Sequence, residues 1–354
     1  MSDRENEGAG PETTTTPEPG IAAEEARQLD LAVGGQALIE GVMMRSPQYL
    51  AMAVRTPEGR IVVRKKIFKS IIRKLPFLNI PVLRGGIFLV ETMGLGIDAL
   101  MFSADQAMSD DRVERKEGTS WKDRLVMWGT IAVSFALSMA VFFYLPILLT
   151  DLIVPASAGS LPWNITDGVI RVIFFVLYLW GISLMPDMRR VFEYHGSEHL
   201  GIHAFEHGRP LTPEGTRGFT TLHPRCGTSF LFFVMLISIF VFALLGRPED
   251  LGDRLQRLAF VPVIGGLAYE AIKLSGKYGK VWFLQPVIFP GLMLQKITTK
   301  RPDDSQLEVS MASLKAVLTP EADDFKERIY YELPPQDESK GAVVQETGSV
   351  EDSA

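Results

Sequence analysis

All five histidines of the chain lie between residues 195 and 223, and four of them recur at every fourth position. On an α-helix, residues four apart are displaced by only about 40° around the axis, so their side chains stack on one face. Two imidazoles one turn apart can bind a single cation. The spacing therefore predicts a metal-binding helix, whose histidines are His195, His199, His203 and His207, followed by His223.

The pattern H-x-x-E-H occurs twice, at residues 195–199 and at residues 203–207. In this pattern both histidines can ligate zinc, and the glutamate between them can act as a general base. The two copies are eight residues apart, or about 12 Å along a continuous helix, so they cannot share one metal. We expect the first copy, with Glu198 as its carboxylate, to form the main site.

A second cluster, His223-Pro-Arg-Cys226, supplies further ligands. Its thiol is the only one in the chain, which excludes an internal disulfide, and in a reducing cytosol it stays free to bind metal. A zinc site takes four ligands, of which three come from the protein where water must also bind. The predicted cofactor is a divalent metal, with zinc favoured by these ligand types. The predicted ligands are His195, His199 and Cys226, with His223 or Glu206 as the fourth.

Simpler interpretations of the same residues stay open at this point. Histidines at every fourth position could form a solvated helix face, and Cys226 could be a small buried residue at the start of an apolar segment. Glu198 could pair with an arginine instead of acting as a base. The arginines available for that are Arg189, Arg190 and Arg225.

Long uncharged segments flank the histidine-rich region. Leu125–Thr150 has 26 residues without a charge, and about 20 suffice for a helix to cross the hydrocarbon core. Gly168–Met185 contains only Arg171, which we expect to reach the interface, and Cys226–Gly246 contains no charge. Leu258–Leu274 is a fourth candidate. The fold is therefore predicted to be mainly α, a polytopic helical membrane protein with about four spans.

Two further apolar segments suit the interface better than a full crossing. Ile80–Phe102 contains Arg84, Glu91 and Asp98, which predicts an amphipathic helix on the membrane surface. Val281–Gln295 has only 15 uncharged residues and two prolines, which favours a re-entrant or interface-lying segment.

The distribution of basic residues predicts the orientation. Lysine and arginine are frequent in residues 55–74, 189–225 and 277–301, whereas residues 151–167 contain neither. By the positive-inside rule, the chain is a multi-pass cell-membrane protein whose two termini are cytoplasmic. The histidine-rich loop, residues 187–225, is then cytoplasmic as well. The basic residues between Arg60 and Lys74 are expected to contact anionic lipid headgroups of the bilayer, and no nucleic-acid partner is expected.

Charge and hydropathy divide the chain into five parts. The acidic ends, with a net charge of −6 over residues 1–30 and −9 over residues 302–354, predict disordered tails at 1–30 and 321–354. Residues 31–124 form a cytoplasmic or interfacial domain, and residues 125–299 form the membrane domain. Residues 300–320 have apolar side chains at helical spacing and predict an amphipathic helix.

A small β-element is expected near the N-terminus. Residues 52–56 and 60–64 have strand-forming side chains on either side of the turn Pro57-Glu-Gly59. We hypothesise that this element docks on the histidine-rich loop, with Glu40 and Arg45 facing it.

Four blocks of sequence carry a resemblance to a known family. They are Gly34–Arg45, Pro81–Gly85, Tyr194–His199 and His223–Ser229. In order and spacing they resemble the signatures of the bacterial YqhQ-like membrane proteins, an uncharacterised family usually described as predicted metal-dependent enzymes. The resemblance covers residues 32–318 and implies no particular substrate. It implies a membrane protein with a metal site at His195, Glu198, His199, His223 and Cys226, whereas His203 and His207 are not family features.

Two functions follow from a metal at this place. In the first, the protein is a zinc hydrolase at the cytoplasmic membrane face: the metal polarises a water, Glu198 or Glu206 takes its proton, and Arg225 stabilises an anionic intermediate. Its substrate would be a lipid-linked molecule or a membrane-proximal peptide. In the second, the metal is a fully ligated structural site that joins the histidine-rich helix to the start of the segment at Cys226, and the protein binds other membrane proteins as an assembly or scaffold factor. Three protein ligands plus water favour the enzyme, which we prefer, and four protein ligands favour the structural site.

Overall fold

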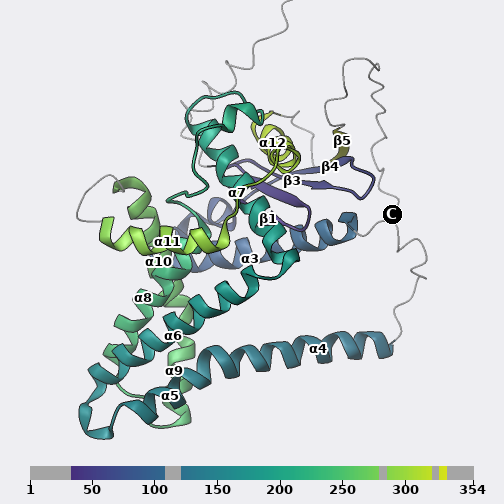
Figure 1. Cartoon of the computed structure of the whole chain (residues 1–354). Coiled ribbons are helices and arrows are strands. Elements are labelled where there is room, and N and C mark those ends of the chain that lie inside the picture. The colour runs from purple at the N-terminus through teal and green to yellow at the C-terminus, as the bar shows by residue number, and fades with distance from the viewer. Residues whose placement is uncertain (1–32, 108–120, 279–284, 321–326, 333–354) are drawn as a thin grey trace, which may run out of the picture.

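The structure is a computed structural model, and it describes residues 33–107, 121–278, 285–320 and 327–332. The predicted tail at residues 1–30 lies outside the described residues. Helices form a bundle at one end of the molecule, and an antiparallel sheet with the helices that cover it forms the other end (Figure 1).

The sheet confirms the predicted N-terminal β-element and extends it. Its five strands are antiparallel and lie in chain order. They are β1 (Gly34–Leu38), β2 (Gly41–Arg45), β3 (Tyr49–Arg55), β4 (Ile61–Ile67) and β5 (Glu327–Glu332).

The fifth strand corrects the prediction of a disordered tail over residues 321–354. Glu327–Glu332 pairs with β4, so that Ile329 lies opposite Arg64 and Tyr331 lies opposite Val62. Arg64 also forms an ion pair with Glu327 across the two strands. Cross-strand pairs of this kind stabilise β5 only because β4 lies beside it. The acidic composition of the tail does not indicate this pairing. The rest of the predicted tail lies outside the described residues.

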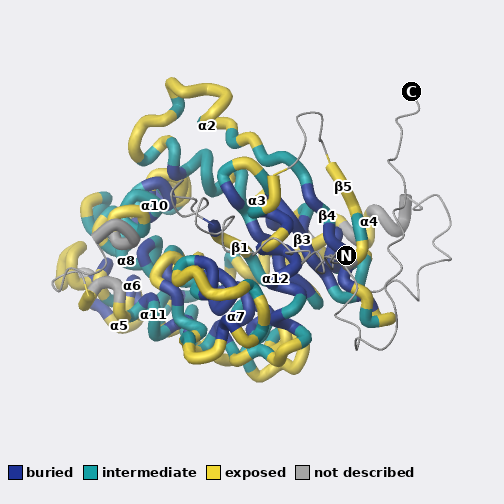
Figure 2. Tube along the Cα trace, turned by 90° about the horizontal axis from the view of Figure 1, so that it is seen from above, coloured by how far each residue is buried: buried dark blue, intermediate teal, exposed yellow. Residues whose placement is uncertain are grey.

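Both faces of the sheet are covered by helices. One face packs against α7 (Pro186–Glu206) and α12 (Asp304–Leu318), and the shared core includes Val42 and Met44 of β2. The other face, with Met43 and Met52, packs against α3 (Leu83–Ala107). Successive residues of a strand point to opposite faces, which explains why β2 is buried on both. Seen from above, the buried residues gather in the central strands β2 to β4 and in α7 and α12, whereas β5 is mostly exposed (Figure 2).

The helix α12 forms in the segment where an amphipathic helix is predicted, and most of its residues are buried. Asp303 caps its start by accepting a hydrogen bond from the Gln306 amide at 2.9 Å, and the Gln306 side chain accepts one in return from the Asp303 amide at 3.0 Å. This capping box satisfies two amides that a helix start otherwise leaves unpaired.

The molecule has five helices, among the described residues, that are long and apolar enough to span a membrane. Four correspond to the predicted spans: Trp128–Ile153, Ser160–Ser183, Gly227–Leu245 and Leu251–Leu274. The first combines α4 (Trp121–Met139), a π-helical turn (Ala140–Tyr144) and α5 (Leu145–Ile153); the others are α6, α8, and α9 (Leu251–Ala259) with α10 (Val261–Tyr278). Bulky apolar side chains on these helices, such as Leu152 and Leu244, are exposed, which fits contact with lipid.

The fifth candidate span is α3, for which the sequence predicted a position on the membrane surface. Two of its acidic residues contact β4 and the segment after it: Asp98 pairs with Lys66 and Arg64, and Glu91 accepts a hydrogen bond from the Ser70 hydroxyl at 2.9 Å. Its Arg84 pairs instead with Glu270 of α10. Other side chains of α3, including Val90 and Met93, are apolar and exposed. The surface position of α3 stays a prediction, as does the interfacial position of α11 (Gln285–Thr298).

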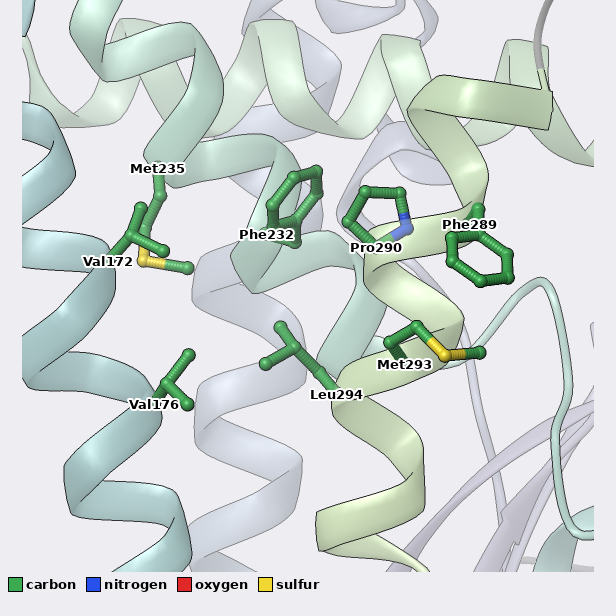
Figure 3. A pocket seen from close by; sticks show the side chains of 8 residues that line it. All are labelled: Val172, Val176, Phe232, Met235, Phe289, Pro290, Met293 and Leu294. Atoms are coloured by element: carbon green, nitrogen blue, oxygen red, sulfur yellow. The ribbon is translucent and has the colours of Figure 1, made fainter.

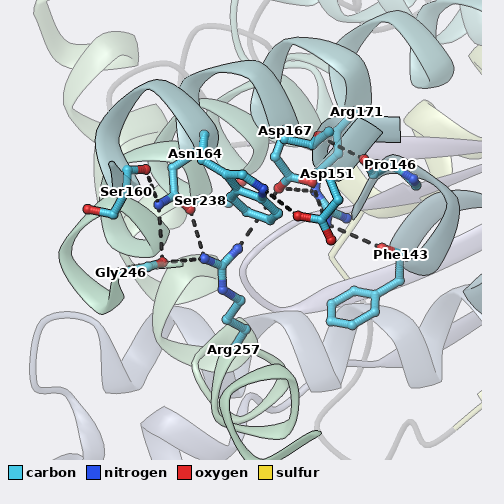
Figure 4. A network of polar contacts seen from close by, with 12 residues as sticks. Phe143, Pro146, Asp151, Ser160, Asn164, Asp167, Arg171, Ser238, Gly246 and Arg257 are labelled. Atoms are coloured by element: carbon cyan, nitrogen blue, oxygen red, sulfur yellow. Dashed lines mark hydrogen bonds and ion pairs between the residues drawn. The ribbon is translucent and has the colours of Figure 1, made fainter. Parts of the chain in front are cut away.

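Polar side chains close the end of the bundle farthest from the sheet (Figure 4). Asp167 accepts hydrogen bonds from Arg171 at 2.8 and 3.0 Å and lies 4.0 Å from Arg257. Arg257 donates to Asn164 at 2.8 Å. Arg171 also donates to the carbonyl of Phe142 at 2.8 Å, within the π-helical turn. Arg171 thus pairs with a carboxylate one turn away on its own helix and with a carbonyl of the neighbouring helix, and its position at the interface stays a prediction.

Candidate metal centre

The helix α7 carries the first H-x-x-E-H pattern in full and the second as far as Glu206, and His207 is its C-cap. It begins with Pro186 in its first turn, where proline needs no amide partner, and it ends at Glu206 before Gly208, which adopts φ 62°. Gly196 lies directly against the carbonyl of Lys300, so α7 approaches the segment after α11 closely. The predicted metal-binding segment is thus one helix, held between the bundle and the sheet (Figure 1).

The structure brings His195, His199 and Cys226 together. One possible ligand atom from each lies within 4.8 Å of the other two. The His195 Nε2 atom lies 3.1 Å from the Cys226 Sγ atom, and the two imidazole centres are 4.5 Å apart. Cys226 is the N-cap of α8 and forms no disulfide. Among the described residues, no fourth histidine, cysteine or carboxylate joins this group.

Backbone carbonyls fix the orientation of both imidazoles. The His195 Nδ1 atom lies 2.8 Å from the carbonyl of Thr298, and the His199 Nδ1 atom lies 2.5 Å from the carbonyl of Thr221. A carbonyl only accepts hydrogen bonds, so each Nδ1 carries the proton and each Nε2 has a free lone pair. The His199 Nε2 atom is buried without a hydrogen-bond partner. This is the arrangement in which metal-ligating histidines are held.

A second group lies beside the first and consists of His203, Glu206 and His223. The His223 Nε2 atom lies 3.4 Å from a Glu206 carboxylate oxygen, and the His203 Nδ1 atom is buried without a hydrogen-bond partner. The imidazole centres of His199 and His223 are 5.7 Å apart, so the groups adjoin. His223 and Glu206, which the sequence offered as the fourth ligand of the first group, are thus placed with His203 instead.

The position of His223 depends on a residue from another element. Gln295 of α11 accepts a hydrogen bond from the His223 amide and donates one to the His223 carbonyl, each at 2.8 Å. The sequence does not indicate this role, because Gln295 is simply the polar end of an apolar segment. Nor could it identify the carbonyls of Thr298 and Thr221, since any residue type supplies a carbonyl. His203, by contrast, had a signal in its spacing.

Burial changes the protonation of the imidazoles. Burial lowers the pKa of His199, of His203 and of His223, and in His223 the carboxylate of Glu198 opposes this effect. Histidines with lowered pKa values are neutral at physiological pH, and the neutral imidazole is the form that binds metal.

Glu198 of α7 is buried where this helix packs against β1, with 6% of its surface exposed. A side chain at Gly35 would come within 3.0 Å of the Glu198 carboxyl carbon, so glycine is required for this close approach. Burial raises the pKa of Glu198, whereas His195, His223 and a hydrogen bond from the Gly35 amide lower it. Glu198 makes no ion pair with an arginine in the described part of the chain.

The three arginines considered as partners of Glu198 pair with other carboxylates. Arg189 lies 3.4 Å from Glu193, Arg190 pairs with Glu40, and Arg225 pairs with Glu206. The Glu40 pair docks the β1–β2 turn on α7, as hypothesised. Arg45 does not face this helix, since its guanidinium lies over the Phe68 ring, 4.2 Å from its centre.

Fold and site together define a multi-pass helical membrane protein with adjoining groups of metal-ligand side chains where its bundle meets its sheet. The chain belongs to the family described as Protein of unknown function (DUF1385), whose model matches residues 80–320. It is 33% identical over 304 residues to the Uncharacterized protein YqhQ of Bacillus subtilis (strain 168), covering 82% of this chain and 93% of that protein. The resemblance seen in the sequence blocks is thereby confirmed. No solved structure matches the chain.

Proposed function

We propose that this protein is a zinc-dependent hydrolase that acts at the membrane face predicted to be cytoplasmic. The observation that carries the proposal is the convergence of His195, His199 and Cys226 without a fourth protein donor among the described residues. Three protein ligands are the usual number where water takes the remaining position. The buried, unpaired Nε2 atom of His199 supports a bound ion, because a buried polar atom without a partner is costly.

Zinc bound there would supply a Lewis acid that makes water a nucleophile at neutral pH. His195 and His199 would be held by the carbonyls of Thr298 and Thr221, so their rings would need little reorganisation on binding. Cys226 would bind as a thiolate and release its proton to solvent.

Glu198 is proposed as the general base. Its carboxylate is free of arginine, whereas the charge of Glu206 is neutralised by Arg225. In this scheme Glu206 positions Arg225, whose side chain is 44% exposed and can face an anionic intermediate. A lipid-linked molecule or a membrane-proximal peptide is the proposed substrate class, because the site lies directly beside the membrane helices.

The second candidate function is a structural metal in a scaffold protein. The adjoining group of His203, Glu206 and His223 favours it, because a rearranged loop could deliver His223 as a fourth ligand. The two functions differ in the number of protein ligands that the metal has.

Zinc analysis of the full-length protein in detergent tests the site, and X-ray absorption at the zinc edge tests the ligand count. We expect about one zinc per chain, which His199→Ala and Cys226→Ser lose. The matched control is His207→Ala, since His207 is exposed and belongs to neither group. Absorption showing two nitrogens, one sulfur and one exchangeable oxygen supports the hydrolase; four protein ligands support the scaffold.

Equal zinc content in all three variants would show that His199 and Cys226 do not bind the zinc, and the proposed site would be refuted. Glu198→Gln is expected to keep zinc and to lose turnover of p-nitrophenyl ester and phosphodiester probes by at least about a hundredfold. Unchanged turnover in this variant, with wild-type turnover above background, would exclude Glu198 as the base.

A further inference from the structure

Two pockets lie one after the other along α6 and α11. The first has a volume of 280 Å³ and is lined by apolar side chains from three helices (Figure 3). They include Val172 and Val176 of α6, Phe232 and Met235 of α8, and Phe289 and Met293 of α11.

The second pocket has a volume of 410 Å³ and is basic. Arg189, Lys296 and Lys300 line it together with Trp180 and Ser183. Neither lysine has an acidic partner among the residues that the structure describes, and only Arg189 is balanced, by Glu193 at 3.4 Å. The pocket therefore carries excess positive charge, and basic pockets at the ends of membrane helices bind anionic headgroups.

The two pockets share the same faces of both helices. Val176 and Trp180 are four residues apart on α6, and Met293 and Lys296 are three apart on α11, so each pair lies on one face. The step from Val176 to Trp180 is about 6 Å along the axis. The basic pocket thus follows the apolar one along the same faces of α6 and α11.

The length of this combined site matches one leaflet of a bilayer. Val172 and Ser183 are separated by about 16 Å along α6, close to half of the roughly 30 Å hydrocarbon core. Trp180 stands between the apolar and basic parts, at the level where indole side chains gather in membrane proteins. A free phosphate would leave the apolar pocket empty, and a neutral lipid would leave the two lysines without a counter-charge.

We propose that these two pockets bind one anionic phospholipid, with its phosphate among Arg189, Lys296 and Lys300 and one acyl chain in the apolar pocket. The phosphate then lies behind the segment that holds the candidate metal centre. Lys296 and Lys300 flank Thr298, whose carbonyl orients His195, and the Lys300 amide donates to the carbonyl of Phe192 at 2.8 Å. Lipid binding needs no metal, so it stands apart from the proposed hydrolase.

Native mass spectrometry of the full-length protein in detergent tests the proposal. Dioleoylphosphatidylglycerol, dioleoylphosphatidylcholine and glycerol phosphate are titrated separately. We expect the phosphatidylglycerol to bind at least about tenfold more tightly than the other two probes. The variant Lys296→Gln/Lys300→Gln should lose this preference, whereas Arg301→Gln should keep it, because Arg301 is exposed next to Lys300 but does not line the pocket.

The apolar part is tested by Val176→Trp, which fills the first pocket, against Val169→Trp at an exposed position of the same helix. We expect only Val176→Trp to weaken phosphatidylglycerol binding, by about tenfold or more. Equal binding of the two lipids, or an unaffected lysine variant, would overturn the proposal. Glycerol phosphate binding as tightly as phosphatidylglycerol would show a phosphate site only. Zinc content is measured in every variant, so that loss of lipid binding and loss of the metal centre are told apart.

Discussion

Gly196 lies where α7 meets the segment after α11, and replacing it with alanine should disturb the candidate metal centre. An added Cβ would collide with the carbonyl oxygen of Lys300 and come within 3.4 Å of Pro302. The backbone at Lys300 cannot move aside easily, because the Lys300 amide donates a hydrogen bond to the carbonyl of Phe192 at 2.8 Å. The carbonyl of Thr298, which orients His195, lies two residues away.

Gly201 on the same helix is a matched control. A Cβ there would meet its nearest neighbours at 3.6 Å, in ordinary contact with Met311 and Ser310. Both substitutions gain the same helix propensity, which therefore cancels in the comparison. What remains is the overpacking at residue 196, which costs about 1–3 kcal/mol. Displacement of a carbonyl that orients a metal ligand typically weakens metal binding by about 10- to 100-fold.

Thermal unfolding in detergent and zinc titration against a competing chelator measure both effects. We expect Gly201→Ala to unfold at or above the wild-type temperature and to bind zinc normally. Gly196→Ala should unfold several degrees lower, since about 1–3 kcal/mol corresponds to a shift of that size, and should bind zinc more weakly. If the two variants behave alike, the close approach of α7 does not support the site.

Two further predictions concern groups away from the metal centre. Asp167→Asn leaves Arg171 and Arg257 without their shared counter-ion and should cost about 3–5 kcal/mol, seen as a lower unfolding temperature than that of the exposed control Asp187→Asn. Burial opposes the charged form of Asp303, but hydrogen bonds from Ser305 and Gln306 hold its pKa below the usual value. The stability that this cap contributes is present above the unfolded-state pKa of about 3.9 and is lost as the pH falls through the lower folded-state value. Asp303→Asn keeps a capping side chain, so unfolding scans from pH 6 to pH 3 should show a smaller acid-induced loss than in wild type, and equal losses would contradict this assignment.

Part of the candidate site could be predicted because it depends on local geometry. The spacing of His195 and His199 alone puts both on one helix face, and Cys226 is the cap of a helix whose apolar run is plain in the sequence. The partner of His223 could not be predicted. It depends on the path of the loop after α7, which Gln295 fixes from 72 residues away in the chain.

The fold likewise contains elements that local sequence predicts and elements that depend on contacts between distant segments. Uncharged runs predict the membrane helices directly, because length and composition are enough for a span. The strand Glu327–Glu332 could not be found in this way, since it pairs with a strand more than 260 residues earlier. The partners of Arg171 could not be predicted for a related reason: they include a carbonyl that only a π-helical turn in another helix presents to it.

The covering of the sheet by α12 sets an order of events during synthesis. Strands β1 to β4 are made first, yet α12, whose Val309 and Leu314 help to bury one face of them, begins 237 residues after β4 ends at Ile67. At translation rates of about 5–20 residues per second, that face waits for about 10–50 s. All the membrane helices emerge from the ribosome in this interval. The apolar sheet face that α12 later buries therefore has to be shielded until the membrane helices have been inserted into the bilayer.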